Sequence, residues 1–237
     1  MFKIQYKIAY IIGAFTLIAS LFMGSLMITA MDSSFYHNEH IKYDTPTYSE
    51  LTIDQLDDAM RLILDYIVDD IDTLDFQMYH QKTGEKFELF NEKEKLHMID
   101  VKVLYQRALI VTVILWVLTI IISAYLFINR KKAAFVGFTY YINRVSIVIS
   151  AIVLLLLFIA ITNFDFFWTN FHHLVFSNDL WLLNPLTDRL ITIVYAEIFF
   201  DLVLSIAVRF SILFIGLNGI CFWYQRRPNS EIDRKLS

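Results

Sequence analysis

Four long apolar runs constrain the fold of this chain more than any other feature of its sequence. They extend from Ile8 to Ala30, from Leu109 to Ile128, from Val145 to Thr162 and from Leu202 to Trp223. At about 1.5 Å of rise per residue, a helix of each length reaches roughly the 30 Å thickness of the bilayer hydrocarbon. The runs therefore predict four transmembrane helices.

The composition agrees with a membrane protein. The 237 residues are 57% hydrophobic and 16% aromatic, with a mean hydropathy of +0.52, which is too apolar for a soluble domain of this length. We expect an all-α integral membrane protein whose four helices carry a mainly helical extracytoplasmic cap with a short hairpin.

Basic residues beside the runs predict how the chain is oriented. By the positive-inside rule, both termini should face the cytoplasm. A cleaved secretory signal is the alternative for the first run, but that run is too long and Ile28 suits a cleavage motif poorly, so we favour a retained helix. The basic residues concerned are Lys3, Lys7, Arg130, Lys131, Lys132, Arg144, Arg226 and Arg227.

We treat residues 1–237 as a single membrane unit, because no repeat, low-complexity tract or Pro/Gly-rich linker divides the sequence. We expect the chain to cross a membrane several times. The predicted parts are a span at 8–30, a cap at 31–107, a span at 109–128, a cytoplasmic loop at 129–144, a span at 145–162, an extracytoplasmic interfacial segment at 163–201, a span at 202–223 and a cytoplasmic tail at 224–237.

The predicted cap is acidic. Between Asp32 and Lys102 it has seventeen Asp and Glu against seven Lys and Arg, which discourages nucleic acids and other anionic ligands. After a polar stretch, apolar residues recur at helical spacing from Ile53 to Ile71, and Thr52 with Gln55 forms a capping-box pattern. This pattern predicts an amphipathic helix with one face to bury.

A hairpin and a long helix should complete the cap. Apolar and polar residues alternate from Phe76 to Leu89 around Gly84, which predicts two short strands joined by a turn. Asn91 followed by Glu94 predicts a helix start, and no breaker separates this start from the second span. We expect one unbroken helix, with His97 about 18 Å above the apolar run.

Six histidines are the first chemical candidates. A metal site is not expected, because the sequence has no H-E-x-x-H motif and the adjacent His172 and His173 should point about 100° apart on a helix. Covalent catalysis has no strong candidate either, because G-x-S-x-G is absent and the lone Cys221 falls near the inner end of the fourth span.

Acid–base chemistry by histidine remains. An imidazole exchanges protons near neutral pH, and Asp100, three residues after His97 on the same helix face, is placed to orient it. The structural interpretation competes with this: His97 is then an interfacial side chain, and Phe164 to Phe176 is an aromatic belt at the headgroups. Taken alone, these residues favour the structural interpretation.

Three motifs together change that balance. EKLHMIDVK (Glu94 to Lys102), FHHLVFSNDLWLLNP (Phe171 to Pro185) and EIFF (Glu197 to Phe200) resemble the lipoprotein intramolecular transacylase family, Lit. The resemblance covers nearly the whole chain, including the number of spans, the acidic cap and the spacing of the histidine motifs. The chain departs from the family pattern at Ala196, where many relatives have proline.

The resemblance implies a reaction and a site. The substrate would be a diacylglyceryl lipoprotein in the bilayer, whose sn-2 acyl chain moves to the α-amino group of its own N-terminal cysteine, with no cofactor. His97 and His172 match the catalytic histidines of the motifs. Asp100 would orient an imidazole, and Asn178 and Trp181 would support the pocket.

Arg209 is a charge inside the predicted fourth span, about 10 Å below Leu202. Such charges usually face the protein interior and pair, here with Asp201 or with main-chain carbonyls. In the alternative, catalytic interpretation, Arg209 polarises the carbonyl group of the substrate ester.

A non-enzymatic membrane sensor or interaction protein is the competing class, in which the acidic cap and its amphipathic helix bind a partner. Transport is less favoured, because the spans lack paired breaks and have few ionisable groups. Partner capture by the cap without lipid chemistry would distinguish a sensor from a transacylase.

Overall fold

The computed structural model describes residues 4–80 and 83–226. Lys3, residues 227–237 of the predicted tail and the hairpin positions 81–82 lie outside the described residues. The chain forms two compact units. The first comprises Met1–Leu26, Ile110–Phe158 and Ile206–Ser237, and the second, called here the cap unit, comprises Met27–Leu109 and Ile159–Ser205.

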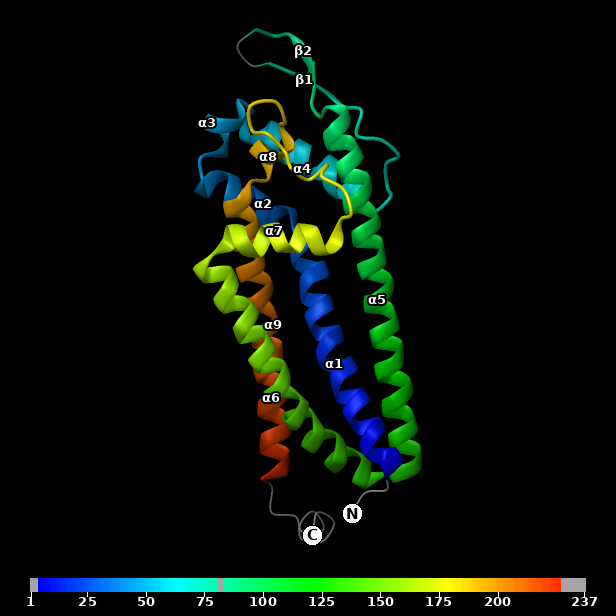
Figure 1. Cartoon of the computed structure of the whole chain (residues 1–237). Helices are drawn as coiled ribbons and strands as arrows, with labels where there is room; N and C mark the ends of the chain where they lie inside the picture. Colours follow the sequence, from blue (N-terminus) through cyan, green and yellow to red (C-terminus); the bar gives the residue numbers. More distant parts are fainter. Residues whose placement is uncertain (1–3, 81–82, 227–237) are drawn as a thin grey trace. The chain divides into compact units, whose positions relative to one another are not determined.

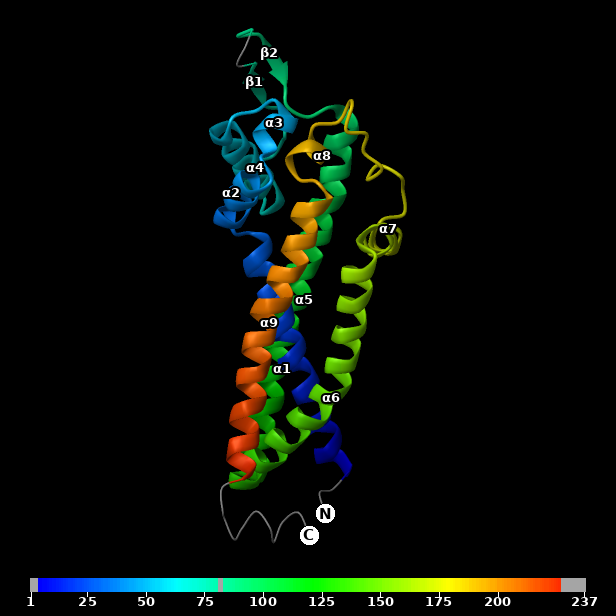
Figure 2. The same ribbon diagram turned by 90° about the vertical axis from the view of Figure 1, so that its left-hand side faces the viewer.

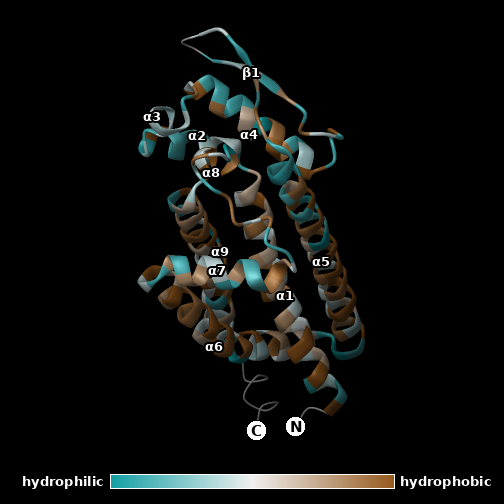
Figure 3. Ribbon diagram, turned by 45° about the horizontal axis from the view of Figure 1, so that its top comes forward, coloured by the Kyte–Doolittle hydropathy of each residue, from teal (hydrophilic) through white to brown (hydrophobic). Residues whose placement is uncertain are grey.

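The prediction of four apolar helices is confirmed. Within the described ranges, four helices are long and apolar enough to cross a membrane; the predominantly hydrophobic colouring of these helices is seen in Figure 3. They are α1 (Ile4–Ala30), α5 (Glu92–Arg130), α6 (Lys132–Thr162) and α9 (Ala196–Gln225). In the predicted loop 129–144, only Lys131 interrupts the helices, with φ of 48°.

Helix α5 is the unbroken helix predicted from Asn91. Its capping box is present, because Glu94 Oε2 accepts the Asn91 N–H at 2.7 Å and Asn91 Oδ1 accepts the Glu94 N–H at 3.0 Å. Its 39 residues correspond to about 58 Å, roughly twice the hydrocarbon thickness. The charged residues gather before Leu109, so the first turns of α5 precede its membrane-spanning part.

Close approach of α1 and α6 organises the first unit. Tyr10 is fully buried in a cluster with Leu126 and Ala134, its ring stacks on Tyr141 at 5.6 Å, and its hydroxyl donates to the Ala133 carbonyl. Gly137 leaves the necessary room, because a Cβ there would lie 2.4 Å from the Tyr10 ring.

The cap unit has two helices that the sequence patterns did not reveal. Both occupy the polar stretch before Thr52: α2 (Ser33–Lys42) and α3 (Thr45–Ser49). Asp32 caps α2, because its carboxylate accepts the N–H of Ser34 at 3.1 Å and of Phe35 at 3.4 Å. The side-chain cap satisfies N–H groups that a helix start leaves without intrahelical partners.

The amphipathic helix of the cap is α4 (Ile53–Ile67), and its predicted capping box is present. Gln55 N–H donates to Thr52 Oγ1 at 3.0 Å, and the Gln55 side chain accepts the Thr52 N–H at 3.0 Å. The helix ends four residues before the predicted Ile71. Asp69, two residues after the end of α4, adopts φ of 75°, a left-handed conformation that Asp tolerates better than most residues.

The predicted hairpin is confirmed as β1 (Gln77–Tyr79) paired antiparallel with β2 (Lys86–Glu88), with Met78 opposite Phe87. Figure 2 shows it extending away from α4. The core beneath it joins α4 to the start of α5 and to the segment leading into α9. Its most buried members include Leu56, Ala59, Met60, Leu89, Phe90, Met98, Ile193 and Ile198.

Candidate active site

The aromatic stretch after α6 folds into α7 (Phe164–Val175). Asn163 caps it, because its side-chain oxygen accepts the Phe166 N–H at 3.0 Å. Figure 1 shows α7 running crosswise to the first turns of α5, which belong to the same unit. Trp168 packs on Phe199 at 4.2 Å between ring centroids, so the start of α9 fixes the position of α7.

His172 lies in the last turn of α7 and is only 6% exposed. Its Nδ1 lies 2.8 Å from the carbonyl oxygen of Trp168. A carbonyl oxygen only accepts, so Nδ1 carries the proton and donates. The other ring nitrogen, Nε2, therefore has a free lone pair when the imidazole is neutral.

His97 comes from the second turn of α5 and is 7% exposed. Its ring centroid lies 6.4 Å from that of His172, and Phe176 contacts both, at 5.4 Å from His97 and 5.7 Å from His172. The Nδ1 atom of His97 is buried and has no hydrogen-bond partner in the described part of the chain. Two buried imidazoles, 75 residues apart in sequence, thus lie side by side.

Aromatic rings surround His172. Trp181 stacks on it at 4.7 Å and 27°, while Trp168 and Phe171 approach edge-on at 4.5 and 5.5 Å. His173 is exposed and meets only the edge of Trp181, at 5.1 Å and 88°. Of the two adjacent histidines, His172 is the enclosed one.

Burial keeps both enclosed histidines neutral at physiological pH. Desolvation, with a smaller effect of neighbouring His172, lowers the pKa of His97 to about 4, although the Asp100 carboxylate opposes the shift. Desolvation also lowers the pKa of His172, against the opposing hydrogen bond to Trp168. Neutral imidazoles are able to accept protons.

The loop that carries Trp181 is anchored to the start of α5. Asn91 Nδ2 donates to Asp188 at 2.9 Å, Lys93 donates to the Leu182 carbonyl, and Glu94 accepts the Leu190 N–H. Burial alone would raise the pKa of Asp188, but hydrogen bonds from Asn184, Asn91 and Thr187 hold it below its usual value. These contacts keep the loop over the histidines.

Three other predicted site residues, Asn178, Asp100 and Arg209, fall in two different units: the first two in the cap unit and Arg209 in the first unit. Asn178 donates from Nδ2 to Asp100 at 2.8 Å and accepts the Leu180 N–H at 3.0 Å, which makes it a turn residue tied to α5. Asp100 is therefore bound to Asn178, whereas Nδ1 of His97 has no partner among residues 4–80 and 83–226. Arg209 lies on α9 in the first unit, and its role stays a prediction.

Two further features of the cap unit were not predicted from the sequence, which suggested Asp201 only as a partner of Arg209. Asp201 binds Lys42 and accepts the Tyr43 hydroxyl, which joins α2 to α9. His40 is fully buried and donates from Nε2 to the Ile193 carbonyl at 3.0 Å. It therefore connects α2 with α8 (Leu190–Ile193). Residue type alone does not distinguish such a structural histidine from a reactive one.

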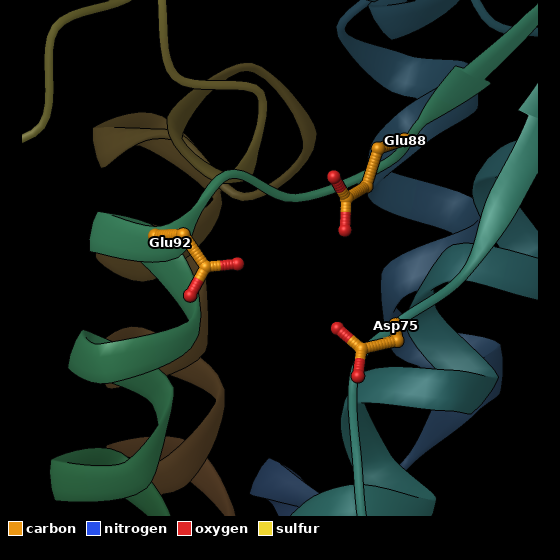
Figure 4. Close-up of side chains that lie close together, drawn as sticks. All are labelled: Asp75, Glu88 and Glu92. Carbon is orange, nitrogen blue, oxygen red and sulfur yellow. The ribbon is translucent and has the colours of Figure 1, made fainter.

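Three exposed carboxylates gather near the hairpin, as Figure 4 shows: Asp75, Glu88 and Glu92. Their oxygens lie within 4.8 Å of one another, as in a cation site. The Lys95 ammonium already pairs with all three, at 2.6 Å from Asp75 and 3.1 Å from Glu92, and in close contact with Glu88. The chain itself therefore already places a cation among these carboxylates.

Four apolar helices of membrane-crossing length within the described ranges, and a cap unit that encloses two neighbouring imidazoles, define a membrane-integral protein with a candidate acid–base site. The family model described as lipoprotein intramolecular transacylase Lit matches residues 11–200. The chain belongs to this family, which confirms the resemblance of its three motifs. Family membership supports an acyltransferase.

Solved structures agree with the fold. Among them, the Lit transacylase from Bacillus cereus superposes with a TM-score of 0.72 at 17% identity, covering 98% of this chain and 97% of that chain. Two structures of the same protein with a histidine replaced, by arginine or by alanine, give TM-scores of 0.68 and 0.67 at 20% identity. They cover 95% and 94% of this chain, and 95% and 96% of those chains. No curated protein sequence matches the chain.

Proposed function

We propose that this protein moves the sn-2 acyl chain of a diacylglyceryl lipoprotein to the α-amino group of the lipoprotein's own N-terminal cysteine. The product is the lyso form, an N-acylated lipoprotein with a monoacylglyceryl group. One observation carries the proposal: two buried imidazoles with centroids 6.4 Å apart, enclosed by aromatic rings. Membership of the Lit family supports this substrate class.

In this reaction the amine must lose a proton and the departing glyceryl oxygen must gain one, which requires a base and an acid. His172 suits the base, because its Nδ1–H is held by Trp168 and its Nε2 lone pair is free to accept. His97, which is neutral before the reaction, acts as the acid only after it has received the amine proton, and its imidazolium, with a pKa of about 4, then gives the proton up readily. The proton taken from the amine returns to the glyceryl oxygen by way of His97.

No covalent intermediate on the protein is required, because donor and acceptor belong to one substrate molecule. The task of the protein is to hold the amine nitrogen against the ester carbon, which lowers the barrier by fixing their proximity. Aromatic walls around His172 also exclude water that would otherwise hydrolyse the ester. Asp100 and Asn178 contribute by fixing the loop before Trp181.

The site belongs at the outer surface of the bacterial cytoplasmic membrane. His97 precedes Leu109 by twelve residues of continuous helix, about 18 Å, which suits the headgroup layer next to the apolar span. Diacylglyceryl groups of lipoproteins lie in this layer. Both termini would then face the cytoplasm.

The test is tandem mass spectrometry of a diacylglyceryl lipopeptide before and after incubation with the purified protein. Transfer within one molecule leaves the total mass unchanged, so fragment ions must locate the acyl chain. Mixing two lipopeptides, one with isotope-labelled acyl chains, distinguishes transfer within a molecule from exchange between molecules. An untouched substrate in several lipids would contradict the proposal and favour the sensor alternative.

Alanine substitutions test the two histidines. His97→Ala and His172→Ala should each reduce turnover at least 100-fold, a typical contribution of one acid or base, while the amount of protein in the membrane persists. His173→Ala is the matched control, because this neighbour is exposed, and its turnover should stay near that of the unaltered protein. Near-normal turnover of either enzyme variant would remove that histidine from the mechanism.

A further inference from the structure

Two buried polar atoms next to His172 have no hydrogen-bond partner within the described ranges of the chain. They are Nε1 of Trp181 and Nδ1 of His97, and the rings that carry them both pack on His172. A polar atom buried without a partner destabilises the fold. Two of them around one imidazole indicate a site that a polar ligand completes.

The indole of Trp181 turns its N–H edge into the protein. The residue is half-buried while its Nε1 atom is fully buried, so the N–H edge is the edge turned into the protein. One face of the indole stacks on His172 at 4.7 Å and 27°. The indole N–H only donates, so its missing partner is an acceptor located beside the imidazole.

Two other side-chain donors, at the start of α5 and on the loop of Trp181, are already engaged. Lys93 donates to the Leu182 carbonyl and lies 3.7 Å from Asp188, and the Asn178 side chain donates to Asp100. His172 is in the last turn of α7, where a helix presents carbonyl oxygens and a partial negative charge. The main chain of α7 therefore offers no N–H groups to a developing anion there.

We propose that the Trp181 N–H binds the carbonyl oxygen of the ester that is attacked. This assignment rests on the proposed transacylation. The amine lone pair forms the N–C bond, the carbonyl π pair moves to oxygen, and the Trp181 N–H stabilises that oxyanion. The C=O bond then re-forms as the bond from carbon to the glyceryl oxygen breaks. The amine proton, taken by His172, ends on the glyceryl oxygen.

A donor aimed at an oxyanion acts mainly in the transition state, so its removal lowers kcat more than it raises KM. Removal of one such donor typically costs about 10²- to 10³-fold in kcat. The structure thus predicts a defined kinetic signature for Trp181. A purely structural role would affect stability or KM instead.

The experiment replaces Trp181 with benzothienylalanine, in which sulfur stands in place of the indole N–H and the stacking surface is kept. We expect kcat for the lipopeptide to fall about 100-fold, with KM and the shape of the pH profile unchanged, because an indole does not titrate in this range. Trp181→Phe, made by ordinary mutagenesis, should show the same loss. The matched control is the same isostere at Trp116, on α5 in the first unit.

Each outcome has a distinct meaning. A kcat within threefold of the unaltered protein, or a loss carried by KM alone, overturns the role of Trp181 and leaves the transacylation in place. Failure of the unaltered protein to convert the lipopeptide overturns the proposed function itself. Loss of kcat at Trp181, with full turnover of the Trp116 variant and an unchanged thermal transition, supports the assignment.

Discussion

At the scale of single residues, the orientation of His172 comes from its own helix. Its Nδ1–H donates to the carbonyl of Trp168, four residues earlier, and the Trp168 ring packs edge-on against the same imidazole. One residue thus selects the tautomer with its main chain and limits ring rotation with its side chain. The base proposed here needs no third side chain to orient it.

The lowered pKa of His97 predicts a dependence of stability on pH. An unfolded histidine has a pKa near 6.5, whereas folded His97 has one of about 4. Below about pH 6.5 the unfolded state therefore binds more protons, and stability falls as the pH falls toward 4. Between pH 7 and 5, His97 alone should account for about 2 kcal/mol of this loss.

Denaturation in mixed micelles at pH 7 and pH 5 measures this contribution. His97→Phe, which keeps a ring in the site, should lose about 2 kcal/mol less unfolding free energy over this interval than the unaltered protein. His173→Phe removes an exposed histidine and serves as the control, with a pH dependence equal to that of the unaltered protein. Equal slopes for all three proteins would contradict a buried, neutral His97.

At the scale of elements, apolar periodicity and capping patterns predicted the long helices, α4 and the hairpin. They did not predict α2 or α3, because the polar stretch before Thr52 has no apolar stripe; α2 buries only Tyr36 and His40. The pairing of the two catalytic candidates was predictable only from the family motifs. Asp100 was expected to orient the imidazole of His97. The hydrogen bond of His172 to the Trp168 carbonyl was not predictable, because every residue has a main-chain carbonyl and no sequence feature marks which one a histidine will use.

The contact of α1 with α6 gives a prediction for Gly137. Gly137→Ala would place a Cβ 2.4 Å from the Tyr10 ring, whose position is fixed by stacking on Tyr141 and by a hydrogen bond to Ala133. Overpacking of this kind costs about 1–3 kcal/mol. The unfolding free energy in micelles should fall by that amount.

Gly216→Ala is the matched control for this substitution. Gly216 also lies in an apolar helix, α9, but a Cβ there meets no described atom within 4 Å. The control should be neutral or slightly stabilising, because alanine favours a helix more than glycine does. Equal effects of the two substitutions would show that close packing at Gly137 does not limit stability.

At the scale of the whole molecule, charge is distributed unevenly along the chain. The cap sequence is strongly acidic, whereas Lys and Arg gather beside the ends of the spans. The positive-inside rule therefore predicts that residues 129–144 and both termini face the cytoplasm. In the predicted orientation, the enclosed histidines would face the outer side, where the proposed substrate is located.

Cysteine labelling in intact cells tests the orientation. In a Cys221→Ser background, Tyr48→Cys replaces a side chain that is 72% exposed in the cap and should react with a membrane-impermeant maleimide. Asn129→Cys, also exposed, should react only after the membrane is permeabilised. The reverse pattern would contradict the proposed topology.

The ion pairs of Lys95 affect how the cap responds to its surroundings. A dissolved divalent ion held by Asp75, Glu88 and Glu92 would be lost to dilution or to a chelator. An ammonium group bonded to α5 has a fixed local concentration and cannot leave. The ion pairs therefore link the hairpin to α5 without a dissolved divalent ion, and a chelator should leave this link in place.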